Sequence, residues 1–298
     1  MSDMRDRVVI VTGAGNGLGR AYALDLAACG AAVVVNNRWT DRSKPSSAEA
    51  VVAEIEKAGG RAVANFDPVE RPESNQAMVD QALATFGRLD AIVSNAGVPE
   101  SQRFHRHSLE DFQTIFNINF FGALYLIHAA LPALSKSESG RIVLSTSSAG
   151  LHGGDGLTAY SSSKAALIGL THALAIESAA RNLMVNAVAP YALTNMTAQH
   201  VAPGASKHMD PADVAPLVSW LVSPACDVSG QVIVCGGGKI RAAYSAEGPP
   251  VRLEKDRVGQ AVHTAMAAEP REIYGNALKA FAAFMDKRPA LAPDAKLV

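Results

Sequence analysis

Short runs of apolar and β-branched residues alternate with longer helix-like segments as far as about residue 240. Continuous apolar runs of this length are typical of strands buried on both faces of a parallel sheet. Strands are predicted at residues 8–11, 32–35, 62–66, 91–94, 141–145, 185–189 and 231–235. Helices are predicted between them at residues 20–29, 47–58, 75–86, 112–134, 159–181 and 214–222. This alternation predicts an α/β fold of Rossmann type, a doubly wound parallel sheet with helices on both faces.

The pattern changes near Ala242, where the strand–helix alternation stops. Two helices are predicted beyond it, at about residues 255–267 and 270–286, before a Pro/Ala-rich end. We therefore expect a single dinucleotide-binding and catalytic domain, residues 1–241, with a helical C-terminal extension, residues 242–298. Such an extension more often docks on the sheet edge or on another subunit than takes part in catalysis.

Composition narrows the class of protein. Hydrophobic residues make up 48% of the 298 residues and charged residues 18%, which suits a large core. A net charge of −1 gives no attraction to nucleic acid or an anionic membrane. The three cysteines lack metal-ligand spacing, so no metal site is predicted, and the first apolar run is too short for a signal peptide. The expectation is a soluble cytoplasmic protein with a small-molecule substrate.

The sequence TGAGNGLG, residues 12–19, joins the first predicted strand to the first helix. Glycines allow a sharp turn and a close backbone approach to a pyrophosphate, and the helix N-terminus supplies unpaired N–H groups. Because the strand–turn–helix context is present, a dinucleotide site is favoured over a turn that is merely rich in glycine.

The second strand ends at Asn37 and Arg38, where the adenosine ribose of a dinucleotide is read. An acidic residue here would bind the ribose 2′-hydroxyl, whereas a guanidinium suits a 2′-phosphate. The sequence therefore favours NADP(H), and the alternative is that Arg38 is a solvated loop residue and Asn37 suffices for NAD(H). Asp67, after the third strand, either accepts from an adenine amine or caps the turn at Pro68.

A second set of residues predicts acid–base chemistry. Tyr160 and Lys164 are four residues apart in a predicted helix and so share one face. A neighbouring ammonium favours the phenolate and lowers the phenol pKa toward a useful range. Ser147, near the end of the fifth strand, carries a hydroxyl that can donate to a substrate oxygen. Taken alone, a Tyr-x-x-x-Lys pair is more often a surface pair than a catalytic site. The glycine turn in the same sequence favours the catalytic interpretation.

With these motifs the sequence resembles the short-chain dehydrogenase/reductase family over about residues 5–240. The resemblance rests on the glycine turn, Asn95-Ala96-Gly97, Asn119, the Ser147–Tyr160–Lys164 set and the sequence NAVAP at residues 186–190. It implies that Tyr160 is the general acid/base, that Lys164 lowers its pKa and holds the nicotinamide ribose, and that Ser147 polarises the carbonyl. It also implies that Asn119 anchors a water in a proton relay, although by itself Asn119 would be read as a helix-surface or helix-kink Asn.

The same resemblance implies an NAD(P)(H) site and a homodimer or homotetramer built on the two long helices. Asn95 is expected to support the sheet and Thr12 to stabilise the neighbouring turn. The residues expected to contact the cofactor are Gly13, Asn16, Gly17, Leu18, Gly19, Asn37, Arg38, Asp67, Pro68, Asn95, Ala96, Gly97, Tyr160, Lys164 and Pro190.

Some residues depart from the family pattern, and some segments resemble one particular group within the family. Ser94 replaces a usual Asn, and Tyr191 follows Pro190 where the family has Gly, so the carboxamide contact, Thr194 or Thr197, stays open. Residues 62–67, 189–197, 213–221 and 236–241 resemble the (R)-3-hydroxyacyl-CoA dehydrogenase part of peroxisomal multifunctional enzymes. That group usually has Asp where this chain has Asn37.

The expected substrate pocket lies at the carboxyl ends of the strands and is mostly apolar, which favours a hydrophobic ketone or alcohol. Its candidate lining residues are Val98, Pro99, Phe104, Leu151, His152, Tyr191 and Leu193, with residues 191–209 as a lid. Arg103, Arg106 and Lys207 either meet phosphates of a CoA substrate or are solvated surface charges.

The leading hypothesis is an oxidoreductase acting on a secondary alcohol or ketone, either a hydroxyacyl thioester or a steroid-like molecule. The alternative is a catalytically silent nucleotide-binding regulatory protein on the same fold. An epimerase or dehydratase that retains its NAD is a third interpretation, but such relatives generally carry a larger C-terminal substrate domain than residues 242–298 provide.

Overall fold

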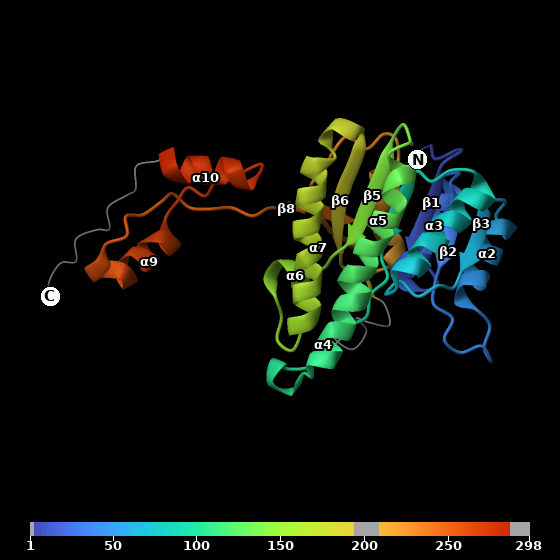
Figure 1. Cartoon of the computed structure of the whole chain (residues 1–298), viewed down its shortest axis with the longest axis horizontal. Coiled ribbons are helices and arrows are strands. Elements are labelled where there is room, and N and C mark those ends of the chain that lie inside the picture. Colours follow the sequence, from blue (N-terminus) through green and yellow to red (C-terminus); the bar gives the residue numbers. More distant parts are fainter. Residues whose placement is uncertain (1–2, 100, 194–208, 287–298) are drawn as a thin grey trace. The chain divides into compact units, whose positions relative to one another are not determined.

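The computed structural model describes residues 3–99, 101–193 and 209–286 and divides into two compact units, Met1–Ala242 and Ala243–Val298. In the first unit one sheet has the strand order β3-β2-β1-β4-β5-β6-β7-β8 (Figure 1). The strands are β1 (Val8–Thr12), β2 (Ala32–Asn36), β3 (Arg61–Asn65), β4 (Ala91–Ser94), β5 (Gly140–Ser145), β6 (Leu183–Pro190), β7 (Val232–Gly236) and β8 (Lys239–Ala243). The pairs from β3 through to β7 are all parallel.

Helices cover both faces of this sheet. One face carries α1 (Gly17–Ala28), α2 (Ser47–Lys57) and α8 (Ala215–Leu221), and α1 contacts both of the others. The opposite face carries α3 (Pro72–Phe86), α5 (Gly122–Leu134) and α7 (Thr158–Glu177), which Figure 1 shows side by side. The chain order changes direction on either side of β1, so the predicted doubly wound Rossmann fold is confirmed.

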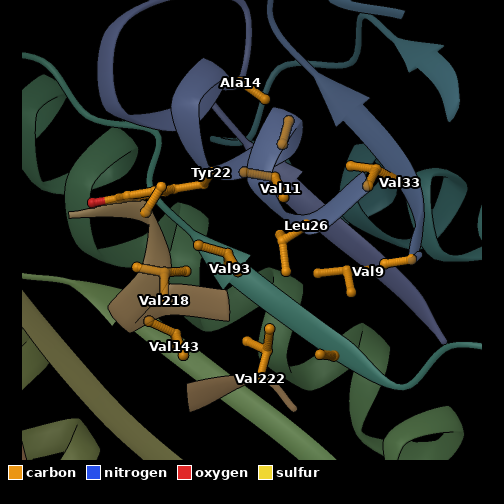
Figure 2. Close-up of a cluster of buried hydrophobic side chains, with 14 of the residues drawn as sticks. Val9, Val11, Ala14, Tyr22, Leu26, Val33, Val93, Val143, Val218 and Val222 are labelled. Carbon is orange, nitrogen blue, oxygen red and sulfur yellow. The ribbon is translucent and has the colours of Figure 1, made fainter. Parts of the chain in front are cut away.

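The core under α1 follows from the two-residue period of the strands. Val9 and Val11 of β1 and Val33 of β2 point to the same face, where Tyr22 and Leu26 of α1 meet them (Figure 2). Every residue of β1 and β2 is buried, because helices cover both faces of the sheet. This packing fixes the carboxyl end of β1, and with it the glycine turn that follows.

Three local elements differ from the prediction. Gly237 and Gly238 have φ angles of +56° and +69° and turn the chain from β7 into β8, as a two-residue hairpin turn requires. The exposed, charged edge strand β8 lacks the apolar run that marks the other strands. The long helix predicted at residues 112–134 is instead α4 (Leu109–Phe116), a π-helical turn η2 (Asn117–Phe121) and α5, and a short helix α6 (Ser148–His152) follows β5.

The run Leu109–Leu134 is long and apolar enough to cross a membrane by length and composition, with 39% of its most apolar window buried. Helices that cover the core of a folded domain meet the same criterion. In this structure α5 contacts α3, β4 and β5. We interpret the run as a covering helix of the sheet.

The second unit holds a short 3₁₀ turn, η6 (Lys255–Arg257), followed by α9 (Val258–Ala267) and α10 (Ala277–Asp286). The helix predicted from residue 270 begins only at Ala277, because the preceding segment pairs backbone to backbone: Glu247 and Glu272 exchange two N–H···O bonds. Large apolar side chains of both helices are exposed within this unit, including Met266, Phe281 and Phe284.

Candidate active site

The turn between β1 and α1 fits closely against the end of β4. Gly13 has a φ of +65°, and a Cβ added there would lie 2.9 Å from the Cα of Ala96. A Cβ at Gly19 would meet the carbonyl oxygen of Gly13 and the Asn95 side chain. Asn16 is the N-cap of α1 but its side chain makes no capping hydrogen bond, so it leaves the N–H groups of the first turn available to an anion. Gly17 and Leu18 form that first turn.

Thr12 and Asn95 lock the turn to the sheet. The Thr12 hydroxyl oxygen accepts from the backbone N–H groups of Asn95 and Ala96, both at 3.0 Å. The Asn95 amide donates to the Thr12 carbonyl oxygen at 3.1 Å, and the Ser145 hydroxyl donates to the Asn95 amide oxygen at 3.4 Å. These contacts tie the carboxyl ends of β1, β4 and β5 together, as the predicted supporting roles of Asn95 and Thr12 require.

A hollow of about 260 Å³ opens beside this turn, at the carboxyl ends of β1, β2 and β4. Its lining residues are Gly13, Asn36, Asn37, Arg38, Thr40, Asp67, Val69, Glu70, Ala96, Gly97, Val98 and Ile118. Six of them are among the residues predicted to contact the cofactor. Glycine at its floor and polar side chains at its rim match what a dinucleotide needs: close backbone approach to phosphate and hydrogen-bond partners for ribose and base.

The rim residues are held by one another. The Asn37 amide donates to the Ser47 hydroxyl at 2.8 Å, and Arg38 pairs with Glu70 at 2.7 Å. Asn65 donates to the Asp67 carboxylate at 2.8 Å, and the Asp67 N–H donates back to the Asn65 amide oxygen at 3.1 Å. Asp67 therefore lines the hollow while it orders the turn before Pro68, so the two alternatives raised for it are compatible.

The catalytic candidates lie at the same edge of the sheet. Ser147 caps α6 and its hydroxyl oxygen accepts from the Ala149 N–H at 3.1 Å. Tyr160 lies in the first turn of α7, half-buried, and its hydroxyl is close enough to the Ser147 hydroxyl for the serine to affect the phenol pKa. Lys164 follows one turn later, with its ammonium nitrogen 5.8 Å from the Tyr160 ring centre. The structure thus brings Ser147, Tyr160 and Lys164 together.

Burial shifts the pKa values of this pair. Burial raises the pKa of Tyr160 above its usual range, and the hydrogen bond from Ser147 offsets the rise only in part. Burial also lowers the pKa of Lys164 to about 8. With its pKa raised, Tyr160 holds its proton at neutral pH. Lys164 is buried and donates to the backbone carbonyl oxygen of Ser145, and its lowering of the Tyr160 pKa stays a prediction.

Asn119 lies in the π-helical turn η2, a type of turn often found at functional sites. Its amide oxygen accepts from the Val98 N–H at 2.8 Å, and its amide nitrogen donates to the Val98 carbonyl at 3.1 Å and to the Ser163 hydroxyl at 3.2 Å. A Cβ on Gly97 would lie 3.2 Å from the Asn119 oxygen and 3.3 Å from the Lys164 nitrogen. Asn119 thus joins the loop after β4 to α7 next to Lys164; its anchored water stays a prediction.

On the substrate side the structure gathers fewer of the predicted residues. Val98 lines the hollow with Ile118, whereas Phe104 and His152 are exposed. Arg103 forms an exposed ion pair with Asp155 at 3.1 Å. Pro190 ends β6 and Tyr191 packs on Gly236 of β7. Thr194, Thr197, Lys207 and the central part of the predicted lid, residues 194–208, lie outside the described residues.

Three residues of the site were missed by the sequence reasoning: Ser145, Ser163 and Glu70. Ser145 holds Lys164 through its backbone oxygen, Ser163 holds Asn119, and Glu70 pairs with Arg38. A backbone contact leaves no mark in a sequence. Glu70 could have been found, since it is the third residue after Asp67 and must lie near the same edge of the sheet.

A glycine turn and a Ser–Tyr–Lys set at one edge of a doubly wound sheet define a dinucleotide-dependent oxidoreductase. The family model described as short chain dehydrogenase matches residues 7–204. A short-chain type dehydrogenase/reductase of Mycobacterium tuberculosis is 40% identical over 245 residues, 81% of this chain and 86% of its own length. The chain belongs to the short-chain dehydrogenase/reductase family, whose members use NAD(P)(H).

The chain is also similar to the narrower group, the peroxisomal multifunctional enzymes. The peroxisomal multifunctional enzyme type 2 of Mus musculus is 41% identical over 238 residues, 78% of this chain but only 32% of the mouse enzyme. A solved short chain dehydrogenase from Mycobacterium avium matches with a TM-score of 0.81 and 36% identity, covering 92% of this chain and 100% of that one. A 7α-hydroxysteroid dehydrogenase, solved with NADH and 7-oxo glycochenodeoxycholic acid, matches with a TM-score of 0.72, 31% identity and coverage of 79% and 94%.

Proposed function

We propose that this protein transfers a hydride between NAD(P)(H) and a hydrophobic secondary alcohol or ketone. The observation that carries the proposal is the convergence of the Ser147 and Tyr160 hydroxyls, with Lys164 buried one helical turn behind them. Two hydroxyls at one point can hold a single substrate oxygen, one orienting it and the other exchanging a proton with it. The adjacent hollow, with Gly13 at its floor, supports dinucleotide binding.

In the reductive direction the side chains have distinct tasks. A nicotinamide bound in the hollow would supply the hydride that the carbonyl carbon receives. The Ser147 hydroxyl donates a hydrogen bond to the carbonyl oxygen and draws charge toward it. Tyr160, which burial keeps protonated at neutral pH, gives its proton to the same oxygen. The ammonium of Lys164, when charged, stabilises the phenolate that Tyr160 becomes. Oxidation uses the same residues in reverse and begins with a deprotonated Tyr160.

We propose a 3-hydroxyacyl/3-oxoacyl thioester, or alternatively a steroid-like ketone, as the substrate class. The likeness to a multifunctional peroxisomal enzyme supports the thioester, and the likeness to a hydroxysteroid dehydrogenase supports the steroid. Val98 and Ile118 supply apolar surface beside the hollow. Arg106 is exposed and Arg103 is in an exposed ion pair, so either could contact a thioester's phosphates only at the protein surface.

For the cofactor we propose NADP(H) in preference to NAD(H), because Arg38 lines the hollow where a 2′-phosphate would lie. We also propose a homodimer or homotetramer in the cytoplasm. The half-buried rings of Phe112, Phe116 and Phe120 follow one another along α4 and η2 and would suit a subunit contact.

The test is titration of the purified chain with NADPH and NADH by nicotinamide fluorescence, followed by turnover of 3-oxoacyl thioesters and oxosteroids. Binding of a cofactor with turnover of one substrate class supports the proposal. Binding without turnover across both classes favours the catalytically silent regulatory protein. Cofactor that survives purification bound to the chain favours an epimerase or dehydratase. Binding of neither cofactor overturns the proposal.

A further inference from the structure

The ion pair between Arg38 and Glu70 lies in the rim of the dinucleotide hollow. The guanidinium and carboxylate are 2.7 Å apart, joined by a hydrogen bond from the Arg38 terminal nitrogen to the Glu70 oxygen. Both residues line the hollow, together with Asn37 and Asp67. Arg38 comes directly after the Asn36–Asn37 end of β2, and Glu70 comes from the segment between β3 and α3. The pair therefore bridges the ends of two neighbouring strands beside the hollow.

Within the described residues, Arg38 is the single cationic side chain among those that line the hollow, facing the carboxylates of Asp67 and Glu70. Arg42, the other arginine of this loop, is held elsewhere. Its guanidinium carbon lies 4.3 Å from the ring centre of Trp39 and 5.6 Å from that of Phe66, in a cation–π arrangement. A phosphate arriving at this rim must therefore be recognised chiefly by Arg38.

We infer that Glu70 is a specificity-determining residue, which competes with a 2′-phosphate for Arg38 and thereby narrows the preference for NADP(H) over NAD(H). This inference rests on the proposed function and deepens it. A dianionic 2′-phosphate has to share the guanidinium with Glu70 or displace it, and it meets the repulsion of that carboxylate. A neutral 2′-hydroxyl meets neither penalty, so NAD(H) binds with the pair intact.

The exposure of the pair decides how strong this competition can be. The side chain of Arg38 is 48% exposed and that of Glu70 is 25% exposed. Water screens charges at such positions, so the pair opens easily and does not exclude the phosphate. The competition should also weaken as the ionic strength rises, because the Debye length falls from roughly 10 Å at 0.1 M salt to roughly 3 Å at 1 M. The expected result is an enzyme able to use both cofactors.

The test uses the Glu70→Gln variant of the full chain, with dissociation constants for NADPH and NADH measured by fluorescence titration at low salt. Glu70→Gln removes the negative charge and keeps the side-chain size, and we expect NADPH to bind about fivefold more tightly with NADH within about twofold of wild type. Glu73→Gln, an exposed acid in the first turn of α3, is the matched control and should change neither constant. The NADPH gain of Glu70→Gln should shrink at 1 M salt.

A second pair of variants separates competition from a structural role. Arg38→Leu should weaken NADPH binding and leave NADH binding unchanged. Adding Glu70→Gln to Arg38→Leu should raise NADPH affinity by less than Glu70→Gln does in wild type, because no guanidinium remains to be released. Suppose that wild type binds a cofactor, but Glu70→Gln changes both dissociation constants equally or leaves NADPH binding unchanged. The role of Glu70 is then overturned, and the proposed function is not. Binding of neither cofactor by wild type would overturn the proposed function itself, and this inference with it.

Discussion

The ammonium nitrogen of Lys164 donates a hydrogen bond to the backbone carbonyl oxygen of Ser145 over 2.8 Å. This contact joins the second turn of the catalytic helix α7 to the last residue of β5. The Ser145 hydroxyl donates in turn to Asn95 at the end of β4. Because Lys164 is only 4% exposed, burial lowers its pKa to about 8. The site therefore keeps a buried cation at a cost in stability.

Replacing Lys164 should reveal that cost. A pKa lowered from 10.5 to about 8 means that charged Lys164 destabilises the fold by about 3 kcal/mol below pH 8. Between pH 8 and 10.5 the unfolded chain binds the proton that the folded chain has released, so wild-type stability rises with pH through this window. Lys164→Met should therefore be inactive yet more stable to urea at pH 7, with a gain that fades toward pH 10.5.

Lys57→Met, at the exposed end of α2, serves as the control and should show no such pH-dependent gain. A Lys164→Met variant that is less stable than wild type by the same amount at pH 7 and at pH 10 would contradict the assignment of a buried cation.

Removing the Tyr160 hydroxyl tests the proton transfer. Tyr160→Phe keeps the ring on α7 but can neither give nor accept a proton, so kcat should fall by roughly 10²–10⁴-fold. Cofactor affinity should stay within about twofold, because the phenyl ring retains the packing. Tyr125→Phe on α5 is the matched control and should keep full activity. The idea fails if Tyr160→Phe turns over substrate at more than about a tenth of the wild-type rate.

The glycine turn can be tested with two substitutions of similar backbone strain. An alanine at Gly13 meets a φ of +65° and places its Cβ 2.9 Å from the Cα of Ala96. Gly59 has a φ of +83°, but nothing lies within 4 Å of a Cβ added there. Gly59→Ala should therefore cost only about 1 kcal/mol of backbone strain. Gly13→Ala should cost more and weaken NADPH binding at least about tenfold, since a shift of this turn reshapes the hollow.

Titration calorimetry and urea unfolding of both variants would check this. Equal losses of cofactor affinity in Gly13→Ala and Gly59→Ala would show that strain alone, and not the close approach of the turn to β4, is responsible.

The parts of the fold that the sequence predicts are those governed by local pattern. The buried strands, the glycine turn and the Tyr160–Lys164 spacing all follow from residue types at short range. The edge strand β8 was not predicted, because charged residues such as Lys239 and Arg241 interrupt any apolar run. The π-helical turn at Asn119 was not predicted, because it depends on hydrogen bonds to Val98, 21 residues earlier in the chain. The rise that burial gives to the pKa of Tyr160 could not be predicted either, because burial is a property of the whole site.

That long-range set of bonds gives Asn119 a role in stability as well as in the site. Its side chain is 1% exposed and satisfies both backbone groups of Val98 and the Ser163 hydroxyl. Asn119→Ala leaves both backbone groups of Val98 without these partners, which should lower the free energy of unfolding by about 2–4 kcal/mol. Because Val98 lines the hollow, NADPH affinity and kcat should fall as well.

Asn117→Ala tests whether this effect is specific to position 119. Asn117 lies in the same π-helical turn, but its side chain accepts from Gln113 at 2.8 Å in an exposed position. Its loss should cost less than about 0.5 kcal/mol and leave NADPH binding unchanged. If both variants lower the free energy of unfolding by the same amount, stability depends on the turn itself and not on the Val98 contacts. If only Asn119→Ala is destabilised and binds NADPH weakly, this side chain joins the loop after β4 to the catalytic helix.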